Sequence, residues 1–312
     1  MLGVCAKRRF YGDIPLSFGE LNSDKTFYVV TLRDSNSKCG FFSLFHVWIF
    51  YVMLAMKKNM IPVVDLENFK TAYSEEDPIH GTRNAWEYFF EQPGGIALDE
   101  VYKSRNVVFS TTKWPEESSI NSEYYNDASK IKIMYDFINT YIKFNKPTLD
   151  YINNAWNAIR PDDKKILAAY SRGTDYNKLK PANHHIQPDP SFLIEQAKKI
   201  MRENNYEYVF LVTDEKKVHD MFSREFGDKL LSVECVYYDE FYEADDSRYI
   251  IEYFHDREHA RYRAALEYLT KIVIASKCGY LIGGINGGSV AALTFNGGRY
   301  DGTNLIDIGR YA

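Results

Sequence analysis

The sequence predicts an α/β protein made of two Rossmann-like domains that face a cleft. Two observations lead to this prediction. Short β-branched or aromatic runs alternate with amphipathic helical segments in both halves of the chain, as in doubly wound sheets. The length of 312 residues also suits two domains of about 150 residues each. We therefore expect one domain at residues 1–160 and a second at residues 161–312.

The first half opens as a strand, a loop, a helix and a second strand. Residues 26–32 (TFYVVTL) and 60–66 (MIPVVDL) read as buried strands. Between them lies the apolar run 40–56, which ends at two lysines and an asparagine, as helix C-termini often do. This run is slightly short for a membrane span of about 20 residues. We interpret it as a buried helix, with a membrane segment as the alternative.

The middle of the chain is less regular. Residues 81–95 (GTRNAWEYFFEQPGG) look like a short aromatic helix that Pro93 stops, and residues 106–110 (NVVFS) like a strand. Residues 121–160 read as helices that break near Pro147.

The second half alternates regularly between strands and helices. Asp189 and Pro190 supply a helix cap and a first-turn proline, and Gly227 supplies a helix stop. We expect strands at residues 165–171, 207–214, 230–236 and 279–284, and helices at residues 191–204, 215–227, 256–276 and 287–298.

The net charge of −5 provides no general basic field for nucleic acid or anionic lipid. An anionic ligand would therefore need a local arginine or a helix N-terminus. The four cysteines show no CxxC pair and no metal-like spacing, so we expect free thiols in a reducing compartment.

Polar residues come directly after the predicted strand at residues 165–171. Arg172 can hold a diphosphate with two parallel hydrogen bonds, and Asp175 can orient the arginine or bind a sugar hydroxyl. Gly173 permits close approach of the backbone, and Thr174 adds a hydroxyl. Ligands of such sheets bind beyond the carboxyl ends of the strands, although a buried Arg–Asp pair that ties a loop would give the same pattern.

Two further strand ends carry candidate ligand contacts. Thr213 and Asp214 end the strand at 207–214, where the carboxylate can accept from a base or a ribose, or simply cap the next helix. The glycine-rich turn from Asn286 to Ser289 opens a helix, and the free N–H groups of a helix start suit a phosphate. It is neither a strict GxGxxG nor a P-loop, so it can equally be a plain glycine turn.

The histidines give weaker indications. His255 and His259 lie four residues apart, but no HExxH motif and no third ligand accompany them, so we expect no metal and no cofactor. His184 and His185 lie in a loop after the arginine motif and are candidates for acceptor contact or for a catalytic base, as is Asp34. Asp175 is a further candidate for the base. A solvent-exposed loop is the alternative for the two histidines.

These motifs resemble those of the fucosyltransferase superfamily, which includes the core α1,6-, the nodulation and the α1,2-fucosyltransferases. The run SRGTDY at 171–176 is similar to its HxRxxD-type donor motif. Residues 35–65, the run FLVTDE and residues 263–293 resemble its other segments, in the same order. Residues 84–93 (NAWEYFFEQP) resemble a segment of bacterial polysaccharide glycosyltransferases.

The resemblance implies a GT-B fold with an N-terminal acceptor-side domain and a C-terminal donor domain. It implies an inverting, metal-independent transfer of fucose from GDP-fucose to a glycan, in the bacterial cytoplasm or at the inner face of the membrane. Arg172 and Asp175 would be catalytic, with Arg172 on the β-phosphate, and Asp214 would lie near the guanosine. The donor site would comprise Gly40, Ser43, Arg172, Gly173, Thr174, Asp175, Tyr176, Thr213, Asp214, Asn286, Gly287, Gly288 and Ser289.

The chain departs from the family pattern at several positions. Tyr170 replaces the motif histidine, Gly173 a second arginine, and Tyr176 a basic residue, while Lys180 lies near the spacing of a glutamate proposed as base. The alternatives are a glycosyltransferase with another nucleotide sugar and a noncatalytic carbohydrate-binding protein of the same fold. A dehydrogenase is disfavoured because no clean GxGxxG follows the first strand.

Overall fold

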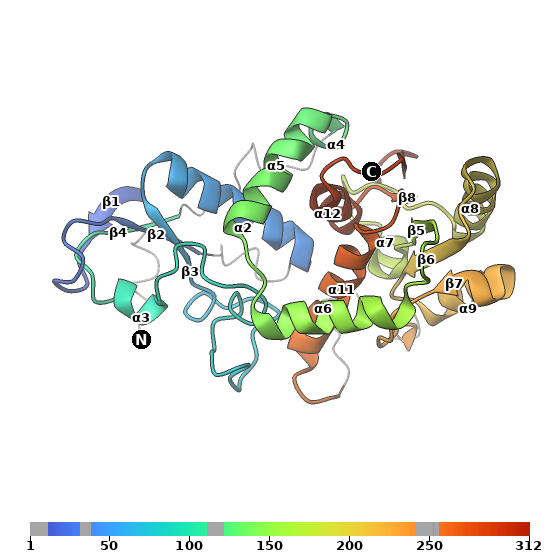
Figure 1. Cartoon of the computed structure of the whole chain (residues 1–312). Coiled ribbons are helices and arrows are strands. Elements are labelled where there is room, and N and C mark those ends of the chain that lie inside the picture. The colour runs from blue at the N-terminus through green and yellow to red at the C-terminus, as the bar shows by residue number, and fades with distance from the viewer. Residues whose placement is uncertain (1–11, 32–38, 111–121, 241–251, 253–255) are drawn as a thin grey trace. The chain divides into compact units, whose positions relative to one another are not determined.

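The computed structural model describes residues 12–31, 39–110, 122–240, 252 and 256–312 (Figure 1). The chain forms two compact units. Unit 1 comprises residues 1–119, 136–149 and 257–265, and unit 2 comprises residues 120–135, 150–256 and 266–312. Each unit therefore includes short segments from beyond the single boundary that the sequence suggested after residue 160.

Unit 1 contains a four-stranded sheet of order β1-β4-β2-β3. Strands β2, β3 and β4 are parallel, and β1 runs antiparallel to β4 at the edge. The strands expected from the sequence at 26–32, 60–66 and 106–110 are confirmed, whereas β1 was not anticipated. The bounds are β1 (Gly12–Leu16), β2 (Phe27–Val30), β3 (Ile61–Val64) and β4 (Val107–Phe109).

The apolar run of unit 1 forms helix α2 (Phe41–Lys57), which contacts β2 and β3. Most of its side chains are buried, among them Trp48 and Tyr51, so the prediction of a buried helix is confirmed. None of the described helices is both long enough and apolar enough to cross a membrane. The short helix α3 (Leu98–Val101) precedes β4.

The helix expected at residues 81–95 is wrong, because this segment is a series of turns. The Asn84 side chain accepts from the Leu66 and Trp86 N–H groups and donates to the Val64 carbonyl, at 3.0, 3.3 and 2.7 Å. These bonds fix the segment against the end of β3 and compete with helical bonding. The aromatic side chains fill the core: Trp86, Tyr88, Phe89 and Phe90 are each at most 2% exposed.

Unit 2 contains a parallel sheet of order β7-β6-β5-β8-β9. In chain order this is 3-2-1-4-5, the order of the Rossmann fold. The predicted α/β class is therefore confirmed, although β7 is shorter than expected and β9 was not anticipated. The bounds are β5 (Ile166–Tyr170), β6 (Tyr208–Val212), β7 (Leu230–Leu231), β8 (Tyr280–Gly284) and β9 (Gly302–Ile306).

The helices of unit 2 follow the sequence pattern closely. Asp189 caps α8 by accepting from the Ser191 N–H at 2.8 Å, and Gly227 ends α9 with a φ of 52°. The six-residue α7 was not anticipated. The helices are α7 (Thr174–Leu179), α8 (Pro190–Asn204), α9 (Lys216–Phe226), the 3₁₀ turn η3 (Gly227–Lys229), α11 (Ala260–Ala275) and α12 (Gly287–Asn296).

Side chains of the unit 2 sheet alternate between its two faces. Leu167 and Ala169 of β5 point to the face that packs on α8 and α9 in one buried apolar cluster. Tyr170 points to the opposite face, where its hydroxyl meets Tyr268 of α11 at 2.9 Å. The sheet is therefore covered on both sides, as expected for parallel strands with buried apolar side chains.

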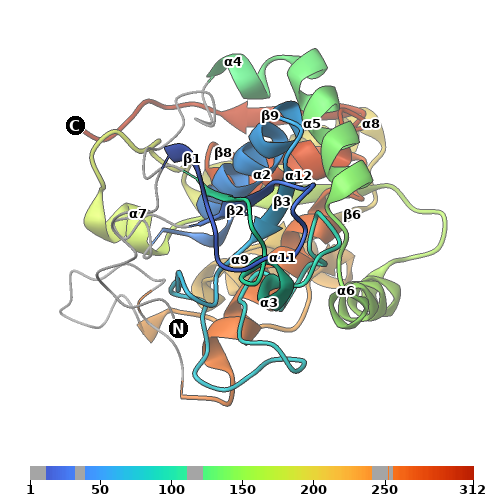
Figure 2. The same ribbon diagram turned by 90° about the vertical axis from the view of Figure 1, so that its left-hand side faces the viewer.

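Three of the five divisions between the units fall within helices. They fall after residue 135 in α5 (Ala128–Tyr141), after residue 149 in α6 (Lys146–Ile159) and after residue 265 in α11. Each is a single helix in Figure 1, and Figure 2 shows the same ribbon turned by 90°. Pro147 lies in the first turn of α6, where its missing N–H costs nothing. The short α4 (Ser122–Tyr125) precedes α5.

Candidate functional site

The carboxyl edge of the unit 2 sheet has its topological switch point between β5 and β8. The chain leaves β5 toward β6 on one side and returns in β8 on the other. Ligands of open α/β sheets bind beyond this point, where the two outgoing loops separate. Arg172 follows β5, and the turn from Asn286 to Ser289 follows β8. The fold therefore brings two of the three predicted strand-end motifs to the position that favours a ligand.

Arg172 is half-buried, and its guanidinium lies over the ring of Tyr176, 4.6 Å from the ring centre. Tyr176 belongs to α7, the short helix that begins at once after the Arg-Gly pair. The Tyr176 hydroxyl in turn hydrogen bonds to Nδ1 of His184 at 3.0 Å. Stacking on an aromatic face fixes the plane of the guanidinium. A guanidinium held in one plane suits an anion with several oxygens.

Two tyrosines lie beside Arg172, of which Tyr170 is buried and Tyr268 half-buried. The Tyr170 and Tyr268 hydroxyls hydrogen bond to each other at 2.9 Å. Burial raises the pKa of Tyr268 to about 12, and the positive charge of Arg172 opposes that shift. Burial likewise raises the pKa of Tyr170 well above its usual value. Both phenols are therefore neutral near pH 7 and form a hydrogen-bonding surface next to the arginine.

The N-terminus of α12 adjoins the same two hydroxyls. A Cβ atom on Gly288 would lie 2.3 Å from the Tyr268 hydroxyl and 2.6 Å from that of Tyr170. Only glycine fits this contact without displacing the tyrosines. Helix N-termini carry partial positive charge, so Arg172, the phenols and α12 make one edge suited to an anion.

The side chains of the glycine-rich turn are already bonded within the protein. Asn286 Oδ1 accepts from the N–H groups of Gly288 and Ser289, at 2.9 and 3.1 Å. Ser289 Oγ accepts from the Asn286 N–H and lies 2.8 Å from the Gly284 carbonyl. This capping box holds the turn in place, so the described contacts support a positioning role for Asn286 and Ser289. Gly287 is the first residue of α12.

Gly173 packs against the start of α9. A Cβ atom there would lie 1.9 Å from Oε1 of Glu215. Glu215 is 1% exposed and forms an ion pair with Lys217 at 2.9 Å. The Glu215 carboxylate thus occupies the space that a side chain at position 173 would need. This packing is a physical reason for glycine where the resembled family has a second arginine.

Thr213 and Asp214 follow β6, and a buried lysine holds this strand end. Lys271 Nζ donates to the Thr213 carbonyl at 2.8 Å and lies 3.4 Å from Cys235 Sγ. Thr213 Oγ1 accepts from the Glu215 N–H at 3.2 Å. The negative charge of Asp214 acts to raise the pKa of both Tyr170 and Tyr268, so this carboxylate belongs to the same edge.

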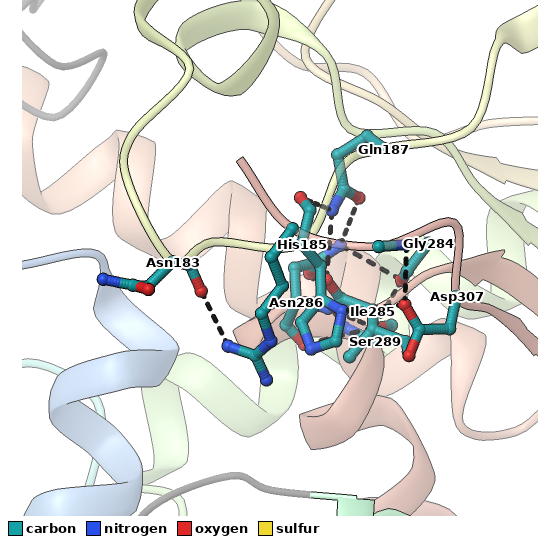
Figure 3. A network of polar contacts seen from close by, with 10 residues as sticks. Asn183, His185, Gln187, Gly284, Ile285, Asn286, Ser289 and Asp307 are labelled. Carbon is teal, nitrogen blue, oxygen red and sulfur yellow. Dashed lines mark hydrogen bonds and ion pairs between the residues drawn. The ribbon is translucent and has the colours of Figure 1, made fainter. Parts of the chain in front are cut away.

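A polar network joins the loop at residues 183–187 to the start of α12 (Figure 3). Gln187 is 5% exposed; its Nε2 donates to the carbonyls of His185 and Ile285 at 3.0 Å each, and its Oε1 accepts from Asn286 Nδ2 at 3.1 Å. His185 lies at the other end of this network, with Nδ1 3.3 Å from Oδ1 of Asp307. The loop that carries both histidines is therefore anchored at the switch point.

The remaining predicted site residues lie in unit 1 or outside the residues that the structure describes. Gly40 is exposed and Ser43 half-buried at the start of α2 in unit 1. Asp34 and His255 lie outside the described residues, and so do the side chains of Thr174 and Asp175. Within the described part of the chain, no three metal-binding side chains come together, and Cys39, Cys235 and Cys278 form no disulfide.

Several side chains at this edge of the sheet could not be predicted from the sequence. Tyr268 and Lys271 lie on a helix about 100 residues from β5, and Asp307 lies after the last strand. Their sequence positions carry no local motif, because only the packing of α11 and β9 brings them to the edge. For Gln187 the sequence offered one indication of a place near the site, namely its position in the loop that follows the arginine motif and α7.

Comparison with known proteins gives structural resemblances alone. No family model matches the chain, and no curated protein matches it. The fucosyltransferase NodZ from Bradyrhizobium is 14% identical with a TM-score of 0.49, over 86% of this chain and 93% of that one. POFUT1 in complex with GDP-fucose is 12% identical with a TM-score of 0.37, over 90% and 73%. Arabidopsis thaliana FUT1 in complex with GDP is 7% identical with a TM-score of 0.49, over 89% and 70%. All three TM-scores are below 0.5, where a common fold is not established.

Proposed function

We propose that this protein is a glycosyltransferase that transfers fucose from GDP-fucose to a glycan acceptor. The observation that carries the proposal is the anion site at the unit 2 switch point. There Arg172 stacks on Tyr176 beside two neutral phenols and the start of α12. The resemblance of SRGTDY and the neighbouring segments to the fucosyltransferase superfamily selects the fucosyl donor among nucleotide sugars.

The chemistry of the transfer explains why such a site is useful. When the bond between the anomeric carbon and the diphosphate breaks, the leaving group gains negative charge and the sugar becomes oxocarbenium-like. A fixed guanidinium and the positive end of a helix stabilise that charge without reorganising. Arg172 therefore acts on the step in which the donor bond breaks, in addition to binding the donor.

The other assignments follow the resemblance and the edge geometry. Asp214 is assigned to the guanosine, Asp175 to the fucose or to Arg172, and Tyr176 to the orientation of the guanidinium. Gly40 and Ser43 are assigned to donor binding on the resemblance alone. Inversion at the anomeric carbon and independence from metal ions belong to the proposal as well. The proposed role in bacterial polysaccharide synthesis rests on the resemblance of residues 84–93, and the proposed cytoplasmic location on the superfamily resemblance and the expected free thiols.

A nucleotide panel tests the proposal. Thermal unfolding is measured with GDP, UDP and ADP, because a ligand that binds the native state raises Tm by mass action. We expect the largest shift with GDP, and transfer of labelled fucose from GDP-fucose to glycan acceptors. A larger shift with UDP or ADP would indicate another nucleotide sugar. No shift and no donor turnover would indicate a noncatalytic carbohydrate-binding protein.

A further inference from the structure

We propose that His185 is the general base of the transfer and that Asp307 holds its imidazole in the reactive tautomer. This inference rests on the proposed function, which leaves the base unassigned. Four residues were candidates from the sequence: Asp34, Asp175, His184 and His185. The described contacts distinguish the two histidines.

The Asp307 carboxylate anchors one side of the His185 ring. Asp307 Oδ1 accepts from the Gly309 N–H at 3.0 Å and lies 3.3 Å from His185 Nδ1. The Gly309 N–H and then His185 hold the pKa of Asp307 below its usual value, so the carboxylate is ionised and only accepts hydrogen bonds. Nδ1 must therefore carry the proton, which leaves a lone pair on Nε2.

The other side of the ring is buried and unsatisfied. The His185 side chain is 10% exposed, and Nε2 has no hydrogen-bond partner among the described residues. A buried acceptor without a partner costs free energy, which a hydroxyl donor would recover. A substrate hydroxyl is such a donor. The ring is thus prepared to accept one proton at a defined atom.

The backbone fixes His185 at the edge that holds Arg172. The segment pairs with the C-terminal residues through a bridge between His185 and Arg310, and Ile186 N–H donates to the Gly309 carbonyl at 2.9 Å. On one side, His184 hydrogen bonds to Tyr176, on whose ring the Arg172 guanidinium stacks. On the other, Gln187 ties the His185 carbonyl to Asn286 at the start of α12. These contacts link the segment of His185 to both motifs of the switch point, and Figure 3 shows the link through Gln187 to Asn286.

Other described histidines lack this combination. His184 is exposed, with Nδ1 on a phenol. His46 also has an unpartnered Nε2, but its Nδ1 faces the Phe42 carbonyl of its own helix, and burial lowers its pKa to about 4. His219 has its Nε2 on the Ser232 hydroxyl at 3.3 Å. Among the described residues, His185 alone combines a carboxylate at Nδ1 with a buried, unpartnered Nε2.

In the proposed step, the acceptor hydroxyl loses its proton as the sugar leaves the diphosphate. His185 Nε2 takes the proton of the acceptor hydroxyl while the acceptor oxygen bonds to the anomeric carbon. The bond between that carbon and the diphosphate oxygen breaks, and its electron pair leaves with the nucleoside diphosphate. The imidazolium, stabilised by Asp307, then releases the proton to solvent. Arg310 and Tyr125 are further charged or titratable groups around His185 and Asp307, and both interact electrostatically with the Asp307 carboxylate.

The test uses His185→Gln and Asp307→Asn in the full chain, with His219→Gln as the matched control on α9. Single-turnover fucose transfer from GDP-fucose is measured against pH, and GDP affinity is measured by calorimetry. We expect His185→Gln to lower transfer by roughly 10²- to 10⁴-fold, as for loss of a general base, and to keep GDP affinity within about 2-fold. The acidic limb of the wild-type pH profile should disappear. Asp307→Asn should give a smaller loss, and the control should match wild type.

A second readout does not depend on activity. Nitrogen NMR of ¹⁵N-histidine-labelled protein at neutral pH should show His185 protonated at Nδ1 and unprotonated at Nε2. Near wild-type transfer in His185→Gln, or equal losses of transfer and GDP affinity, would overturn the proposal. An Nε2–H tautomer would overturn it as well. If the wild-type protein binds no nucleotide, the proposed function fails, and the tautomer still decides whether His185 is held as a base.

Discussion

An arginine stacks on a tyrosine near each end of α12, although the tyrosines belong to other helices. At the C-terminal end Arg299 lies over the ring of Tyr135 at 4.5 Å, and at the N-terminal end Arg172 lies over Tyr176 at 4.6 Å. Arg299 Nε also donates to the Asn296 carbonyl at 2.6 Å, so its charge is favourable near the negative end of the helix. Arg172 acts on the two tyrosine hydroxyls that adjoin the positive end of the helix, the end that favours anions. The two stacks therefore lie near helix ends of opposite polarity.

Removal of the two arginines is the sharpest test of this difference. Arg172→Ala should lower fucose transfer by roughly 10²-fold or more, because a preorganised charge near the leaving group is lost. Arg299→Ala should lower stability by about 0.5–1 kcal/mol, the value of an exposed cation–π contact, and leave transfer unchanged. Transfer rates and urea unfolding of both variants provide the measurements. Equal transfer rates in the two variants would remove the distinction.

The glycines at the two ends give a second comparison. Gly288→Ala forces a methyl group against the Tyr268 and Tyr170 hydroxyls, and Gly297→Ala forces one to within 2.5 Å of the Tyr135 ring at a φ of 69°. Overpacking should destabilise each variant by about 1–3 kcal/mol, with added strain at Gly297.

The two glycine variants should differ in ligand binding. We expect Gly288→Ala to weaken GDP binding and Gly297→Ala to leave it intact, as calorimetry on the folded variants would show. Weaker binding in both would mean that the alanine effects spread along α12.

A smaller effect is expected from the phenol pair. Tyr170→Phe and Tyr268→Phe each remove one hydroxyl of a partly buried hydrogen bond, which contributes about 1 kcal/mol. In a double-mutant cycle the two losses should not add, because both variants break the same bond. Additive losses in urea unfolding would show that the hydroxyls act separately.

Alkaline pH provides the smallest expected difference. The pKa of Tyr268 is raised to about 12 from an unfolded value near 10, so the native state retains a proton that the unfolded chain has lost. The stabilisation is complete below pH 10 and is lost as pH rises toward 12. Tyr268→Phe should therefore lose stability less steeply over this range, by up to about 1.4 kcal/mol per pH unit. Identical slopes in urea unfolding at pH 9, 10 and 11 would contradict the assignment.

The sequence predicted most strands and helices because their apolar periodicity coincides with burial. The helix predicted at residues 81–95 is absent. There the Asn84 side chain bonds to the backbone and four aromatic side chains fill the core without helical structure. Nor did the sequence predict α7, which has too few apolar residues for a periodic signal. Local patterns do not reveal such segments, because their conformation depends on contacts with distant strands.

The candidate site was partly predictable for the same reason. Arg172 was found because polar residues directly after a buried strand mark the carboxyl edge of a sheet. Its surroundings were not found, since Tyr268 and Asp307 reach the edge through packing across more than 90 residues of chain. The capping box of Asn286 and Ser289 matches a known sequence pattern only loosely, so the sequence suggested free donors there.

The interleaved segments of the two units have a consequence for synthesis. Residues 257–265 complete unit 1: Tyr262 stacks on Phe89 at 5.5 Å, and its N–H donates to Glu75 at 2.8 Å. These residues leave the ribosome only after most of unit 2 has been made. Unit 1 therefore cannot complete its folding before most of unit 2 has been synthesised, contrary to the common N-to-C order of domain folding. A gene fragment that stops at residue 160 would encode unit 1 without residues 257–265.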